Sequence, residues 1–177
     1  SKPLEGTSFF ETIEKQIQAW SSGTSVEQTV ALYGPQGCGK STLLQNLETK
    51  FKSNGLKTIL LKVESKVFTE KSLDTLLESV ASLGESEKAI VLLDDAHNLF
   101  LSTIGGFKTY QKFLEKTEEM KNIFWIVSYS EFSWQFLNDV LEKNQYFRLE
   151  LRIPRWTSDE LKTMILEAHG QIGITLQ

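Results

Sequence analysis

Five short apolar runs alternate along this chain with segments whose apolar residues recur at helical spacing. Strands that are apolar on both sides are typical of a parallel sheet covered by helices on both faces. No internal repeat and no linker interrupts the pattern. The sequence therefore predicts a single doubly wound α/β domain, with strands at 29–33, 58–63, 89–93, 123–127 and 146–153.

A glycine-rich motif separates the first predicted strand from the helix that follows it. Gly34–Ser41 matches the pattern G-x-x-x-x-G-K-[ST] in the strand–loop–helix context that this pattern requires. Glycines let consecutive backbone N–H groups curl around a phosphate, and the helix N-terminus adds positive potential. Lys40 is expected to reach the β- and γ-phosphates, and Ser41 to place its hydroxyl on Mg²⁺. The predicted nucleotide-binding residues are Gly34, Pro35, Gln36, Gly37, Cys38, Gly39, Lys40, Ser41 and Thr42.

Cys38 lies between two of these glycines and beside Lys40. A helix N-terminus and a neighbouring cation both favour the thiolate. We therefore expect bound ATP to protect this thiol from alkylation. The alternative is an inert side chain that apolar packing hides.

A pair of acidic residues follows the third predicted strand, Ala89–Leu93. A carboxylate at the end of a buried strand beside a phosphate loop holds Mg²⁺ directly or through water, and this is the role predicted for Asp94, together with Ser41. Asp95 occupies the place where many such proteins carry a glutamate that polarises the attacking water. The alternative is a pair of solvated acids without a function. His97 is a candidate sensor or water relay, or else a structural histidine.

Composition and charge argue against several other classes. The 19 basic and 23 acidic residues give a net charge of −4, which disfavours nucleic-acid binding through bulk charge. One cysteine excludes an intramolecular disulfide and, with only two histidines, disfavours a zinc site. No apolar run approaches the roughly 18 residues of a membrane span, and the N-terminus is unlike a signal peptide. We expect a cytoplasmic, intracellular protein or the cytoplasmic part of a larger one.

Together, Gly34–Ser41, Leu92–His97 and the polar end of the fourth predicted strand resemble P-loop ATPases of the AAA+ and STAND groups. The resemblance implies a three-layer αβα P-loop NTPase fold whose five-stranded parallel sheet has the order 5-1-4-3-2. It also implies a sensor 1 residue at the end of the fourth strand, which contacts the γ-phosphate or the lytic water. Ser128 matches that position, and Ser130 is the second choice.

The resemblance further implies contributions from outside the phosphate loop. Motor-type members complete the site with an arginine from a neighbouring subunit, and all three arginines of this chain lie between positions 148 and 155. Arg148 is the candidate for this arginine finger, and Arg155 is the alternative. A third possibility is that these arginines are solvated or pair with nearby acids. The adenine base is expected to lie against residues 4–10.

Two features depart from the family pattern. The Asp-Asp pair resembles switch-like members more than fast motors, yet those switches often carry an arginine at the position of Ser128. The helical lid that normally follows the fifth strand, with its sensor 2 arginine, is missing from the sequence. We therefore expect residues 1–177 to be a single nucleotide-binding core excised from a longer protein, with slow hydrolysis in isolation.

The predicted function is a Mg²⁺-dependent ATPase module that drives conformational change in a larger protein. The Asn-Lys-x-Asp motif of GTPases, the Leu-Ser-Gly-Gly-Gln motif of ABC subunits and the basic lid of small-molecule kinases are all absent. The alternative is a slow or non-hydrolysing STAND-like switch, and a third reading is a DNA-linked AAA+ partner, which lacks a basic stripe. The expected partners are ATP, other domains or proteins, and further copies of the full-length chain.

Overall fold

The computed structural model describes residues 6–65, 69–101, 107–140, 146–147 and 149–175. Five parallel strands form one sheet with the order β2-β3-β4-β1-β5. Counted from the other edge, this is the predicted order 5-1-4-3-2, so the predicted fold class is confirmed. The strands are β1 (Thr29–Gly34), β2 (Lys57–Lys62), β3 (Ala89–Asp94), β4 (Ile123–Ser130) and β5 (Leu149–Arg152).

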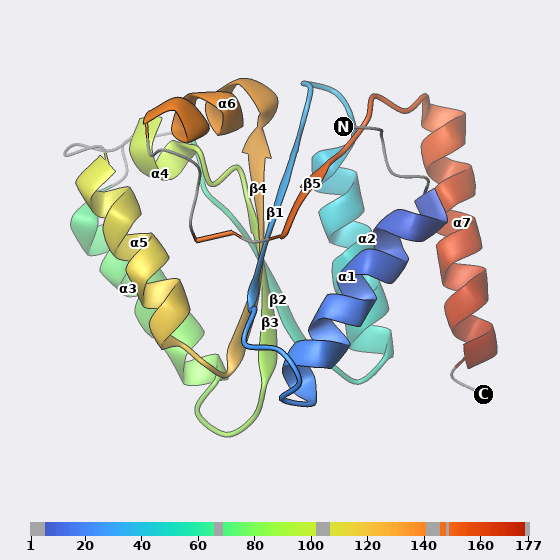
Figure 1. Ribbon diagram of the computed structural model, residues 1–177, viewed down its shortest axis with the longest axis horizontal. Helices are drawn as coiled ribbons and strands as arrows, with labels where there is room; N and C mark the ends of the chain where they lie inside the picture. Colours follow the sequence, from blue (N-terminus) through green and yellow to red (C-terminus); the bar gives the residue numbers. More distant parts are fainter. Residues whose placement is uncertain (1–5, 66–68, 102–106, 141–145, 148, 176–177) are drawn as a thin grey trace.

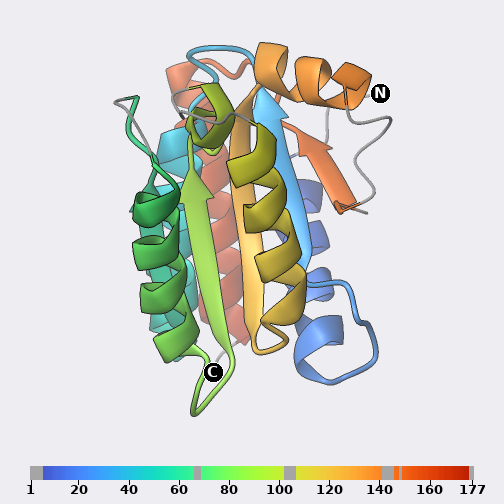
Figure 2. The same cartoon turned by 90° about the vertical axis from the view of Figure 1, so that its left-hand side faces the viewer.

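Helices cover both faces of this sheet and complete three layers (Figures 1 and 2). One face carries α1 (Gly6–Ser21), α2 (Lys40–Ser53) and α7 (Ser158–Thr175), which lie on the right in Figure 1. The other face carries α3 (Glu70–Leu83), α4 (Asn98–Leu101), α5 (Phe107–Glu119) and α6 (Glu131–Val140). Within the described residues, no helix combines the length and apolar character needed to cross a membrane.

The strands are apolar on both sides because each face of the sheet has its own core. Every residue of β3 is buried, and its successive side chains alternate between the two helical layers. Val91 and Leu93 belong to the core beneath α3 and α5, whereas Ile90 and Leu92 belong to the core beneath α1 and α2. This double burial explains why the apolar runs identified the strands.

Some local features differ from the expectation. The predicted strand 146–153 is shorter, since β5 begins only at Leu149. The four-residue helix α4 was not predicted, because one turn is too short to show helical periodicity.

On α6, Trp134 is buried in the core and stacks on Tyr33, with ring centroids 5.4 Å apart, whereas Phe132 is 78% exposed. Trp134 is therefore a core residue.

A pair of tyrosines ties α5 to β4 inside the core. The hydroxyl oxygens of Tyr110 and Tyr129 lie 2.6 Å apart, and both side chains are fully buried. Burial raises the pKa of both phenols above the ordinary value, so both remain neutral. Each hydroxyl depends on the other, because a buried polar group without a partner is costly.

Removing both hydroxyls of this pair should therefore cost less than the two single removals added together. Tyr110→Phe or Tyr129→Phe alone should lower the free energy of unfolding by about 1–3 kcal/mol, because the remaining hydroxyl loses its partner. The double variant should lose less than the sum of the two single losses. Urea unfolding of the four proteins measures the coupling, and strictly additive losses would contradict it.

Candidate functional site

The three sequence motifs meet at the carboxyl edge of the sheet, where β1, β3 and β4 end side by side. A cavity of about 460 Å³ opens there. Its lining combines the loop after β1 with residues that follow β3 and end β4. The lining residues are Gln36, Gly37, Cys38, Gly39, Lys40, Ser41, Thr42, Asp95, His97 and Ser130.

Two glycines give the loop its curvature. Gly37 and Gly39 have φ angles of 78° and 88°, a left-handed conformation that side chains with a Cβ rarely adopt. Gly34 is required for a different reason, because a Cβ there would lie 2.6 Å from the carbonyl oxygen of Ile153. The loop conformation therefore depends on glycine at three of its positions.

Lys40 opens α2 and folds back over the loop. Its ammonium donates to the carbonyl oxygens of Gly34 at 2.9 Å and Pro35 at 3.3 Å, and Nζ lies 3.6 Å from the sulfur of Cys38. The N-terminus of the 14-residue helix α2 points toward the same cavity. A lysine cation and a helix N-terminus together favour an anion at this place.

Asp94 is the buried acid at the end of β3, and it is only 4% exposed. Its Oδ2 accepts a hydrogen bond from the Ser41 hydroxyl at 2.6 Å, and its Oδ1 accepts from the Ser128 hydroxyl at 2.5 Å and from the Asp95 N–H at 3.0 Å. These donors satisfy a carboxylate that burial would otherwise destabilise. The adjacent Ser41 and Asp94 oxygens are hard ligands of the kind that Mg²⁺ prefers.

Ser128 points toward Asp94 and not into the cavity. Its hydroxyl is fully buried, donates to Asp94 and accepts from the Asp95 N–H at 3.0 Å. The second choice for sensor 1, Ser130, does line the cavity. Ser128 is thus placed to orient the two acids.

Asp95 lies at the cavity wall with an unusual backbone. Its φ of 55° is the only positive value at a non-glycine among the described residues, and Asp tolerates this conformation better than most residues. Its Oδ2 lies 3.6 Å from Nζ of Lys62. Lys62 was not predicted from the sequence. Its position at the end of β2, in register with Asp94, is the feature from which it could have been predicted.

His97 faces the cavity from the turn that leads into α4. Its Nδ1 accepts a hydrogen bond of 3.2 Å from the backbone N–H of Ser130. Burial lowers the pKa of this imidazole, and the cation of Lys40 adds to the decrease, while the carboxylate of Asp95 opposes it. The ring is therefore neutral at pH 7.

The remaining candidates are the arginines and the segment expected to contact adenine. Arg148 lies outside the described residues, so the finger assignment stays a prediction. Arg155, the alternative, donates to the carbonyl oxygen of Gln36 at 3.3 Å, and Arg152 pairs with Glu131 at 2.5 Å. In the segment expected to contact adenine, residues 4–5 are outside the described part, and Phe9 is buried against Trp156.

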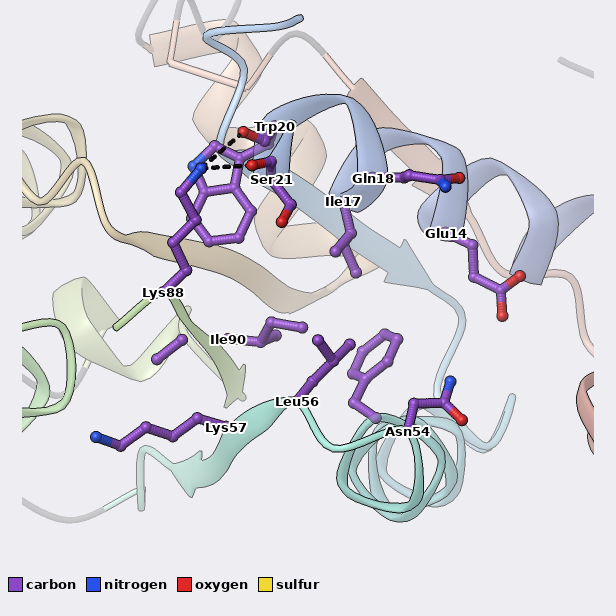
Figure 3. A pocket seen from close by; sticks show the side chains of 12 residues that line it. Glu14, Ile17, Gln18, Trp20, Ser21, Asn54, Leu56, Lys57, Lys88 and Ile90 are labelled. Carbon is purple, nitrogen blue, oxygen red and sulfur yellow. Dashed lines mark hydrogen bonds between the residues drawn. The ribbon is translucent and has the colours of Figure 1, made fainter. Parts of the chain in front are cut away.

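A second cavity, of about 370 Å³, lies at the amino ends of β2 and β3 (Figure 3). Apolar side chains such as Ile17 and Ile90 line it, and the ammonium of Lys88 closes one side by donating to the carbonyl oxygens of Trp20 and Ser21. None of the motif residues contributes to its lining. The chemistry suggested by the motifs therefore belongs to the cavity at the carboxyl edge.

Comparison with known proteins agrees with this geometry. Residues 30–150 match the family described as "ATPase family associated with various cellular activities (AAA)". The chain belongs to the AAA family. As an AAA domain it is a nucleotide-binding P-loop protein, of a family whose members are typically ATPases. No curated protein sequence gives a significant match.

Two solved structures resemble this AAA domain in fold. The Aeropyrum pernix ORC1 protein in complex with DNA shares 15% identity at a TM-score of 0.54, with 90% of this chain and 48% of that chain covered. The FIGL-1 AAA domain in complex with ADP shares 13% identity at a TM-score of 0.57, with 89% and 57% covered. The chain thus spans about half the length of these proteins.

The structure buries the thiol of Cys38, which agrees with the second of the two alternatives, an inert side chain hidden by apolar packing. Only 1% of the residue is exposed, and it packs within the core beneath α1 and α2. We predict that iodoacetamide modifies the native protein at least about a hundredfold more slowly than the urea-unfolded chain, because labelling requires local opening. Mass spectrometry of timed samples measures both rates. Equal rates would mean that the thiol is accessible in the folded loop.

Proposed function

We propose that this AAA domain binds ATP with Mg²⁺ and hydrolyses the bond between its β- and γ-phosphates. The observation that carries the proposal is the hydrogen bond of 2.6 Å between Ser41 and Asp94, which joins the phosphate loop to the acid of β3. Sites of this class hold Mg²⁺ with these two residue types. The nearby ammonium of Lys40 supports a polyphosphate at the same place.

Each residue then has a role that follows from its position. The loop N–H groups and Lys40 bind the phosphates, while Ser41 and Asp94 would hold the metal. Mg²⁺, when bound, neutralises charge on the phosphate oxygens. Asp95 orients the attacking water and accepts its proton, and Ser128 keeps the two acids in position through its hydrogen bonds.

A slow nucleotide switch is the second candidate function, and one observation favours it. The proposed water-activating carboxylate of Asp95 is paired through Oδ2 with Lys62 at 3.6 Å, so one of its two oxygens is already engaged by a cation. The pair is partly exposed, since Lys62 is 61% exposed, and exposed pairs are weak, so the pairing can slow the proton transfer but does not prevent it. Slow turnover is therefore compatible with the same site.

The nucleotide cycle is proposed to drive conformational change in a larger assembly. We infer that the domain acts on adjoining domains or on protein partners, with Arg148 of one copy completing the site of another. ORC1 was solved in complex with DNA, but the net charge of −4 gives no support for DNA binding by this chain.

Lys40→Ala should weaken ATP binding at least tenfold, about 1.4 kcal/mol, because it removes the side-chain cation nearest to the phosphates. Lys52→Ala is the matched control, since Lys52 lies on the same helix and pairs with Glu48 on its exposed side. Isothermal titration calorimetry with ATP and Mg²⁺ measures both variants. Equal affinity of Lys40→Ala and wild type would refute the assignment of the phosphate loop.

The two acids should separate binding from turnover. Asp94→Asn should abolish the Mg²⁺-dependent part of ATP affinity, whereas Asp95→Asn should keep the affinity and lower hydrolysis about a hundredfold, because it removes the proton acceptor. Phosphate release and calorimetry under the same conditions distinguish the two effects. Full hydrolysis by Asp95→Asn would show that another group activates the water, and undetectable hydrolysis by wild type would favour the switch.

A further inference from the structure

His97 bridges two elements that meet at the phosphate cavity. Its backbone belongs to the turn between β3 and α4, and its ring accepts a hydrogen bond from Ser130 at the junction of β4 and α6. The side chain is half-buried and lines the cavity together with Lys40 and Asp95. None of the roles assigned above uses it.

The hydrogen bond to Ser130 determines which ring nitrogen carries the proton. Because Nδ1 accepts from a backbone N–H, it has no hydrogen of its own. Burial lowers the pKa of the ring, so the imidazole is neutral and its single proton lies on Nε2. Within the described residues, Nε2 has no hydrogen-bond partner. The cavity thus contains a neutral N–H donor in a fixed tautomer.

The position of this donor in the cavity indicates that it would contact the last phosphate of a bound nucleotide. In the proposed ATP site, the curled loop 34–41 would enclose a phosphate at the N-terminus of α2, and the cavity is also lined by Asp95, His97 and Ser130, which lie outside this loop. We expect a phosphate beyond the enclosed one to approach these three residues. Ser128 has no free donor for it, because its hydroxyl proton is directed to Asp94.

We propose that His97 determines the preference for a nucleoside triphosphate over a diphosphate, by donating its Nε2–H to a γ-phosphate oxygen. The inference rests on the proposed ATP site and deepens it. The same ring joins the γ-phosphate to α6, since Ser130 also caps that helix: its hydroxyl donates to Ser133 Oγ at 2.7 Å and accepts from the Ser133 N–H at 3.2 Å. Loss of the γ-phosphate would therefore change the hydrogen-bonded contacts at the start of α6.

Two variants separate the two ends of the ring. In His97→Asn, the carboxamide oxygen can replace Nδ1 as the acceptor for Ser130, but no donor reaches the position of Nε2. In His97→Gln, the longer side chain can place an N–H near the position of Nε2, but the acceptor for Ser130 is lost. The measured quantity is the ratio of the Kd for ADP to the Kd for adenylyl imidodiphosphate, both with Mg²⁺, determined by calorimetry.

His97→Asn should lower this ratio about tenfold, as expected for one hydrogen bond to a charged group, with an unchanged ADP affinity and an unchanged melting temperature. His97→Gln should keep most of the ratio while its melting temperature falls. If His97→Asn keeps the wild-type ratio, or if ADP affinity falls in parallel, His97 has only a structural role and the inference is wrong. If wild type binds neither nucleotide, or Lys40→Ala binds both as well as wild type does, the proposed function itself fails.

Discussion

The buried carboxylate of Asp94 is the interaction on which the arrangement of the site depends. A carboxylate on a residue that is only 4% exposed must be surrounded by donors, and here there are three: the Ser41 hydroxyl of the phosphate loop, the Ser128 hydroxyl of β4, and the N–H of Asp95. One side chain thus fixes α2, β3 and β4 relative to one another. Of the two hydroxyl donors, Ser41 lines the cavity and Ser128 does not, so Ser41 can exchange Asp94 for a ligand while Ser128 and the Asp95 N–H hold the acid in place.

The strand order is what brings these donors together. Because β4 lies between β1 and β3, the residues that end β4 are flanked by the phosphate loop on one side and by the acidic turn on the other. Ser128 and Ser130 both point toward this edge, but they serve different neighbours, since Ser128 contacts Asp94 and Ser130 contacts His97. An order in which β1 and β3 were adjacent would leave no room for this division.

The sequence predicted the elements whose cause is local. The apolar runs predicted the strands because each strand is buried on both faces, and the glycine motif predicted the loop because its conformation requires φ values that only glycine tolerates well. The site residues were predicted by position along the chain, but their orientations were not. Whether the hydroxyl of Ser128 faces the cavity or Asp94, and whether Lys62 reaches Asp95, depends on contacts between strands that are distant in sequence. Burial of the Cys38 thiol depends on the core formed by α1 and α2 in the same way.

Packing from the far side of the loop adds a constraint that no motif contains. A Cβ at Gly39 would lie 2.8 Å from a methyl group of Leu161 on α7, so the tip of this leucine lies directly against a glycine whose φ of 88° already favours glycine. At the start of the same segment, Trp156 packs edge-on against Phe9 of α1, with ring centroids 6.4 Å apart. The phosphate loop therefore meets two other parts of the fold, Asp94 through the Ser41 hydroxyl and α7 through Leu161 at Gly39. Because Leu161 lies against Gly39, a displacement of α7 would change the packing of the loop backbone that is proposed to bind the phosphates.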